Sequence, residues 1–182
     1  MILVGMGSNL PFCGMEPPSV LQFALDAIAR TVDVSAVSRL YRAPSWPDPS
    51  LPPYANAVAM VTTQKSPQAL LAALRRIENA FSRRRTDPNA PRTLDLDLLA
   101  YGEQIMQGDT KEALKLPHPG IAERDFVLAP ICDIAPDWRH PLSGRRADDL
   151  LSGLQPVSAL PMEEFHLTLG PRTARQPTLW RD

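Results

Sequence analysis

The sequence predicts an α+β sandwich of the ferredoxin-like, split βαβ type, with a mostly antiparallel sheet and helices on one face. Helical and strand-like patterns follow one another in the order strand, helix, strand, strand, helix, strand. Proline-rich loops separate several of these segments. With 182 residues, 44% of them apolar, the chain is long enough to bury one core without disulfide or metal staples.

The individual elements follow from local patterns. Helices are expected where apolar residues recur at helical spacing, over residues 18–31, 66–81, 121–134 and 147–152. Strands are expected where apolar residues run together or alternate, over residues 1–6, 32–43, 54–64 and 92–101, with a short return strand around 105. The second helix has a clear start, with Ser66 as N-cap and Pro67 in the first turn.

Bulk properties exclude several classes of protein. A net charge of −1 gives no global basic field for nucleic acid or an anionic membrane. No apolar run is long enough to span a membrane, and the N-terminus resembles a first strand rather than a signal peptide. Cys13 and Cys132 form no CxxC pattern and are expected to be reduced, buried thiols. These features favour a cytoplasmic protein.

Two aspartates on a predicted strand are the first candidate for chemistry. Asp95 and Asp97 are two residues apart, so both carboxylates point to one face while Leu94, Leu96 and Leu98 point to the other. Adjacent carboxylates are typical ligands of Mg²⁺, which takes one or two of them together with substrate phosphates. A solvated strand face is the structural alternative.

A basic loop lies close to this pair in the sequence. Arg83, Arg84, Arg85 and Arg92 fall within a dozen residues of Asp95. Arginine binds phosphate oxygens bidentately, and phosphoryl transfer depends on charge neutralisation and positioning. The combination favours a phosphoryl or pyrophosphoryl transferase over a merely solvated charge cluster. The GxG near the N-terminus lacks the rest of a P-loop.

Several motifs together resemble one family, 6-hydroxymethyl-7,8-dihydropterin pyrophosphokinase. They are GSNL (7–10), YRAP (41–44), YANAV (54–58), RIENAFSR (76–83), PRTLDLDLL (91–99), LPHP (116–119) and ERDFVLAP (123–130). The resemblance spans about residues 1–150 in the family's order and spacing. It implies a pyrophosphokinase domain over residues 1–155, followed by an extension over 156–182 of unspecified structure. It also implies a monomer that acts on ATP and a reduced pterin, without nucleic acid or membrane.

The resemblance assigns the ATP side of the site. It implies that Asp95 and Asp97 hold two Mg²⁺ ions and that Arg83 and Arg92 stabilise charge during the reaction. Further nucleotide contacts are implied for Glu78, Arg85, His118 and Arg124. The reaction implied is direct attack of the pterin hydroxyl on the β-phosphorus of ATP, with AMP leaving.

For the pterin, the resemblance points to Tyr54, Asn56 and Phe126, with the backbone of Ala43, Pro44 and Ser45. A flat ring with an amide-like edge suits aromatic stacking and a side chain that both donates and accepts. Tyr54 and Phe126 are equally compatible with core positions. Trp46 is expected to cover the site from the proline-rich loop 44–53.

The chain departs from the family pattern in the basic loop. Pro88-Asn89-Ala90 stands where Arg-Trp-Gly is usual, and Ser82 replaces a usual glycine. Ala43 and Ala113 also differ from common residues. Three alternatives stay open: another DxD metal enzyme such as a nucleotidyl- or glycosyltransferase, a sheet that binds single-stranded RNA, and, given the altered loop, a catalytically inactive relative.

Overall fold

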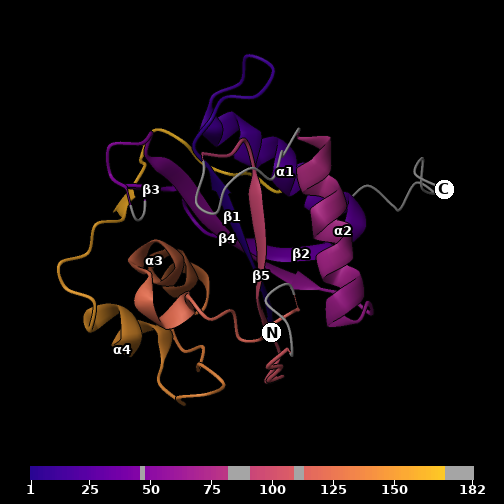
Figure 1. Cartoon of the computed structure of the whole chain (residues 1–182), viewed down its shortest axis with the longest axis vertical. Coiled ribbons are helices and arrows are strands. Elements are labelled where there is room, and N and C mark those ends of the chain that lie inside the picture. Colours follow the sequence, from indigo (N-terminus) through magenta and orange to yellow (C-terminus); the bar gives the residue numbers. More distant parts are fainter. Residues whose placement is uncertain (46–47, 82–90, 109–112, 171–182) are drawn as a thin grey trace.

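A central antiparallel sheet organises the molecule (Figure 1). The computed structural model describes residues 1–45, 48–81, 91–108 and 113–170. The sheet order is β5-β1-β4-β3-β6, with β2 also paired to β4, and each strand pair among the described residues is antiparallel. The strands are β1 (Ile2–Ser8), β2 (Asp33–Val37), β3 (Tyr41–Ala43), β4 (Tyr54–Thr62), β5 (Asp95–Tyr101) and β6 (Leu160–Pro161). The α+β class and the ferredoxin-like arrangement are confirmed.

Two long helices cover one face of the sheet. They are α1 (Pro17–Thr31) and α2 (Pro67–Ala80). Each begins with proline, whose missing N–H is not needed in a first turn, and the Ser66 hydroxyl caps α2 by accepting from Ala69 N at 3.2 Å. Their apolar stripes meet inward residues of β1, β4 and β5 in a continuous core that includes Val4, Leu25, Leu74 and Leu96.

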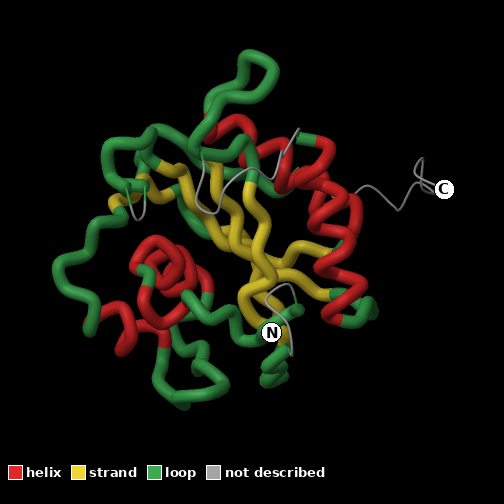
Figure 2. Tube along the Cα trace, viewed as in Figure 1, coloured by secondary structure: helices red, strands yellow, loops and turns green. Residues whose placement is uncertain are grey.

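The one-face helix layer that the sequence predicted is formed by α1 and α2, and the opposite face carries further helices that were not expected there. A 3₁₀ turn (Ile121–Glu123), α3 (Asp125–Ile134) and α4 (Ala147–Ser152) pack there. Figure 2 shows helices on both sides of the strands. Successive side chains of a strand point to opposite faces, so Leu3, Val58 and Leu99 point away from the first core. They form a second core with these helices. The apolar pattern of residues 121–134 predicted a helix but did not specify its face.

Two strand predictions need correction. The segment 32–43, expected as one strand with one irregularity, is divided into β2 and β3, which both pair with β4; between them Ser38 N still donates to Val58 O of β4 at 3.0 Å. The return strand expected around Ile105 is an isolated bridge between Met106 and Leu116.

The chain after residue 155 pairs with the far edge of the sheet and then contacts α1 at Thr168. β6 pairs with β3, and Met162 N donates to Leu40 O at 2.8 Å. Farther along, Thr168 N donates to Gln22 Oε1 of α1 at 2.9 Å. This segment therefore covers an edge that would otherwise expose unpaired backbone groups.

Both cysteines are free, as expected, but neither is fully buried. Cys13 is exposed and Cys132 is partly buried. Burial, reinforced by the nearby Asp148 and Asp133 carboxylates, raises the pKa of the Cys132 thiol to about 11. Within the described part of the chain, no helix has the length and apolar character needed to cross a bilayer.

Candidate active site

A cavity of about 290 Å³ opens on the α3 side of the sheet. Alternation puts Gly5 and Gly7 of β1, Asn56 of β4, and Asp95 and Asp97 of β5 on this face. The other lining residues come from the same strands, the loops and α3: Met6, Pro44, Tyr54, Ala57, Val58, Arg92, Leu99, His118, Arg124, Phe126 and Val127.

The two aspartates share the cavity, as their spacing predicted. Arg92 Nη1 donates to Asp95 Oδ2 at 2.9 Å, and both side chains are about three-quarters buried. Asp97 is more open, with 43% of its side chain exposed, and its Oδ2 lies 4.0 Å from His118 Nε2. The carboxylates thus line the cavity, while Leu94, Leu96 and Leu98 are buried in the core behind them.

The segment from His118 to Arg124 forms the opposite wall. His118 N donates to Leu99 O at 2.8 Å, which fixes the segment to β5. Gly120 N donates to His118 Nδ1 at 3.1 Å, so Nδ1 is an acceptor and a neutral ring carries its proton on Nε2, toward Asp97. Gly120 also leaves room for Arg124, since a Cβ there would lie 2.6 Å from the guanidinium carbon.

Two aromatic side chains and one amide side chain line the other end of the cavity. Tyr54 and Asn56 of β4 face Gly7, where a Cβ would lie 3.4 Å from Asn56 Oδ1. The Asn56 side chain is buried, and its Nδ2 has no hydrogen-bond partner among the described residues. Phe126 lies under the Arg124 guanidinium, 5.9 Å from ring centroid to Cζ. A buried amide donor without a partner favours a ligand with an acceptor here.

Comparisons with known proteins identify this arrangement. The family model for 7,8-dihydro-6-hydroxymethylpterin-pyrophosphokinase (HPPK) matches residues 3–136. The chain belongs to this family. It is an ATP-dependent pyrophosphokinase that acts on hydroxymethyldihydropterin in folate biosynthesis.

Individual relatives agree with the family match. The chain is 40% identical over 153 residues to the Pseudomonas aeruginosa 2-amino-4-hydroxy-6-hydroxymethyldihydropteridine pyrophosphokinase, covering 83% of this chain and 90% of that one. It is 34% identical over 161 residues to the Synechocystis enzyme of the same name, covering 88% and 79%. The family match favours a pyrophosphokinase over the RNA-binding and other DxD-transferase alternatives.

A solved structure supports the fold alone. Plasmodium falciparum HPPK-DHPS superposes with a TM-score of 0.67 at 12% identity, covering 84% of this chain. This pyrophosphokinase chain spans 44% of the length of that protein.

Some predicted site residues lie elsewhere or are not described. Pro44 lines the cavity, whereas Ala43 and Ser45 are buried beside it. Glu78 is buried on α2 and is not among the described cavity residues, because its Oε1 accepts from Leu96 N at 2.8 Å behind the strand. Trp46, Arg83 and Arg85 lie outside the described residues, as do the departures at Ser82 and at 88–90.

Asn9 supports the site, a role that its own sequence position did not predict. Its Oδ1 accepts from Arg92 N at 2.7 Å, and its Nδ2 donates to Pro52 O at 3.0 Å and to Ser45 Oγ at 3.3 Å. One buried amide therefore joins the end of β1, the proline-rich loop and the arginine that pairs with Asp95. Its place in the GSNL motif was the available signal.

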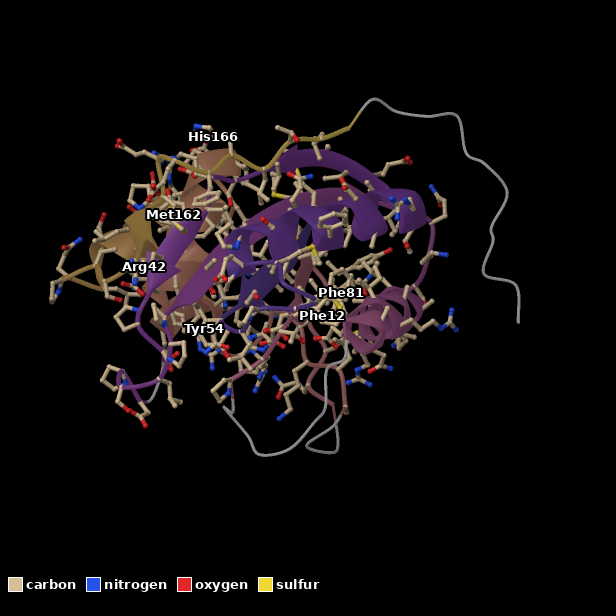
Figure 3. The ribbon with its side chains drawn as sticks, turned by 90° about the horizontal axis from the view of Figure 1, so that it is seen from above. Phe12, Arg42, Tyr54, Phe81, Met162 and His166 are labelled. Atoms are coloured by element: carbon tan, nitrogen blue, oxygen red, sulfur yellow. The ribbon has the colours of Figure 1, made fainter. Side chains whose placement is uncertain are left out.

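The base of the basic loop is fixed by a second contact. Phe12 and Phe81 lie side by side in Figure 3, with ring centroids 5.4 Å apart. The Thr93 hydroxyl donates to Phe81 O at 2.5 Å, and the Ser8 hydroxyl donates to Thr93 O at 2.6 Å. The ends of β1, α2 and β5 are therefore joined next to the site.

A charged network anchors α3 to the sheet. Asp133 accepts from Arg39 Nη2 at 2.6 Å and from the Tyr41 hydroxyl at 2.8 Å. Burial and the hydrogen bond to Asp133 raise the pKa of Tyr41 to about 12. Burial alone would raise the pKa of Asp133, but the Arg39 and Tyr41 hydrogen bonds outweigh it and hold that pKa below its ordinary value.

Proposed function

We propose that this cavity is where a diphosphate group passes from ATP to the hydroxymethyl oxygen of the reduced pterin, with AMP leaving. One observation carries the proposal: a buried amide donor without a described partner and a pair of carboxylates share one small cavity. The first suits recognition of a heterocycle edge, and the second suits a metal-bound triphosphate.

The pterin end would be formed by Tyr54, Asn56 and Phe126. Asn56 Nδ2 would donate to a ring acceptor and its Oδ1 would accept from a ring N–H or amino group, which satisfies an otherwise costly buried amide. The aromatic side chains would hold the flat ring in place. The backbone around Pro44 would close the ring edge, and the contributions of Ala43, Ser45 and Trp46 stay predictions.

Asp95 and Asp97 fit Mg²⁺ by their chemistry, because both offer hard oxygen ligands on one face of one strand. Among the described residues, no group of three or more His, Cys, Asp or Glu side chains is arranged to hold a metal. A carboxylate pair completed by phosphate oxygens is a usual magnesium arrangement. Two such ions, when bound, would neutralise charge on the phosphates and polarise the attacked phosphorus.

The cationic residues of the cavity would hold the triphosphate. Arg92 is positioned by Asn9 and Asp95, and Arg124 lies over Phe126 beside Gly120. His118 would donate from Nε2 to a phosphate oxygen, since Nδ1 accepts from Gly120 N. The same role for Arg83 and Arg85 stays a prediction.

The mechanism requires positioning rather than a protein nucleophile. The pterin hydroxyl oxygen attacks the β-phosphorus as the bond from that phosphorus to the α-phosphate oxygen breaks, and AMP carries that oxygen away. Arg92, Arg124 and His118 would bind the phosphate oxygens where negative charge is greatest. The attacking hydroxyl would lose its proton to solvent, to which Asp97 is the more exposed of the two carboxylates.

Other expectations concern the protein as a whole. We expect a monomer that acts in the cytoplasm on small molecules, without nucleic acid or membrane. The pyrophosphokinase domain is expected to comprise residues 1–155, with 156–182 as an extension.

The test is product analysis with ATP and Mg²⁺, with and without 6-hydroxymethyl-7,8-dihydropterin. Pterin-dependent AMP is the expected product. ADP would mean transfer of the γ-phosphoryl group and would contradict the mechanism. Tight ATP binding without turnover would instead identify a relative whose altered basic loop no longer supports the reaction.

A further inference from the structure

A carboxylate occupies a core position on α2. The buried residues of this helix are Pro67, Leu70, Leu74 and Glu78, which follow helical spacing along one stripe. Glu78 is only 2% exposed. A leucine would suit packing there, and burying a carboxylate is costly unless strong hydrogen bonds satisfy it. Glu78 therefore calls for a specific explanation.

Its described partner is the backbone of β5, the strand that carries Asp95 and Asp97. Glu78 Oε1 accepts from Leu96 N at 2.8 Å, in a buried hydrogen bond. β5 lies at one edge of the sheet and pairs with β1 on its inner side. An edge strand presents N–H groups that lack a neighbouring strand, and Leu96 is itself buried. Glu78 supplies the acceptor that a further strand would have provided.

Leu96 is the residue between the two site aspartates. Its side chain packs in the same core as Leu74, while Asp95 and Asp97 point into the cavity on the other face. Fixing the Leu96 amide therefore fixes the backbone from which both carboxylates project. The contact also comes from α2, whose C-terminal end is joined to β5 through Thr93 and Phe81.

We propose that Glu78 is a positioning residue for the Asp95–Asp97 pair, acting through Leu96 N rather than by contact with ATP. The inference rests on the proposed metal role of that pair. A charge-assisted hydrogen bond at this point would hold the carboxylates at a separation suited to divalent cations. Residues that orient metal ligands typically change metal affinity by about 10–100-fold when removed.

The experiment compares Glu78→Gln with Glu78→Ala. Mn²⁺ affinity is measured by electron paramagnetic resonance with saturating α,β-methylene-ATP, and exchange of the Leu96 amide by NMR. Glu78→Gln keeps an acceptor oxygen, so Mn²⁺ affinity is expected within about threefold of wild type and the amide stays protected. Glu78→Ala is expected to weaken Mn²⁺ binding about 10–100-fold and to expose the amide to exchange.

Leu74→Ala is the matched control, one turn earlier on the same buried stripe. It weakens the packing of α2 but leaves Glu78, the acceptor for the Leu96 N–H, in place, so Mn²⁺ affinity is expected to be unchanged. All three variants are compared with wild type at a temperature where each is folded.

Two results would overturn the proposal. Wild-type Mn²⁺ affinity in Glu78→Ala would mean that the contact serves stability alone. Equal loss of metal-free ATP affinity in both Glu78 variants, measured with EDTA present, would mean direct contact with the nucleotide. These readouts need no turnover, so they remain decisive even if wild type releases no AMP and the proposed function fails.

Discussion

The two faces of the sheet use the same strands for different purposes. On the α1–α2 face, Val4, Leu96 and Leu98 pack into a continuous apolar core. On the α3–α4 face, the next residues along those strands include Gly5, Asp95 and Asp97, which line a cavity. The second face has its own apolar core, but that core covers only part of the sheet.

The difference shows how a small fold separates stability from chemistry. Because adjacent side chains of a strand point to opposite faces, β5 contributes leucines to an apolar core and aspartates from the adjacent positions to the cavity. On the α1–α2 face, apolar packing positions the strands. On the α3–α4 face, polar contacts such as Arg39–Asp133 and Asn9–Arg92 position the segments around the cavity.

The largest effect is expected from a core truncation on the covered face. Leu25→Ala removes a fully buried α1 side chain, and such changes cost about 2–5 kcal/mol of unfolding free energy. The Michaelis constant for the pterin is expected to stay unchanged below the unfolding temperature. Urea unfolding and steady-state kinetics measure the two quantities. A large change in the Michaelis constant at low denaturant would contradict the view that one face stabilises the fold and the other binds substrate.

A substitution in the cavity should weaken pterin binding without lowering the free energy of unfolding. Asn56→Ala removes the amide expected to bind the pterin edge, at a cost of about 1–3 kcal/mol in pterin binding. The free energy of unfolding is expected to hold or rise, since a buried donor without a described partner is lost. Calorimetric titration with the pterin tests the first part, and thermal unfolding without ligand tests the second. Unchanged pterin affinity would remove Asn56 from the site.

Gly120→Ala tests the wall of the cavity. The added Cβ would lie 2.6 Å from the Arg124 guanidinium, which must then move. Loss of one charged hydrogen bond to phosphate would weaken ATP binding by roughly tenfold. The pterin affinity measured without nucleotide serves as the control and should not change. ATP affinity equal to that of wild type would mean that Arg124 does not contact the triphosphate.

The smallest effect concerns the anchor of α3. The pKa of Asp133 in the folded protein lies below its ordinary value of 3.8, so its contribution to stability is present above that pH and is lost as pH falls through the folded value. Asp133→Asn is expected to lower the melting temperature by about 2–4 °C at pH 7. The difference from wild type should vanish at acidic pH. A difference that is constant with pH would contradict a charge-based anchor.

Part of this arrangement could be predicted from sequence. The two-residue spacing of Asp95 and Asp97 within an alternating segment determines a shared face, because strand periodicity is strict. The Ser66-Pro67 start of α2 likewise follows from local capping chemistry. Family motifs supplied Tyr54, Asn56 and Phe126, which the structure brings into one cavity.

Other features depend on contacts that leave no periodic signal. Which face α3 covers is decided by long-range packing, not by its apolar content. The role of Asn9 depends on two loops that meet it from distant positions in the chain. Glu78 resembles a surface residue of a helix until its backbone partner, Leu96 N, is known.

One measurement tests the central claim most directly: pterin-dependent AMP formation by Asp97→Ala and Leu98→Ala, neighbours on opposite faces of β5. Asp97→Ala is expected to lose activity by at least about a hundredfold, as when a group that stabilises transition-state charge is removed. Leu98→Ala, assayed where it is folded, is expected to keep its turnover number within a few-fold of wild type. Near wild-type activity in Asp97→Ala, or an equal loss in both variants, would contradict the assignment of chemistry to one face of the sheet.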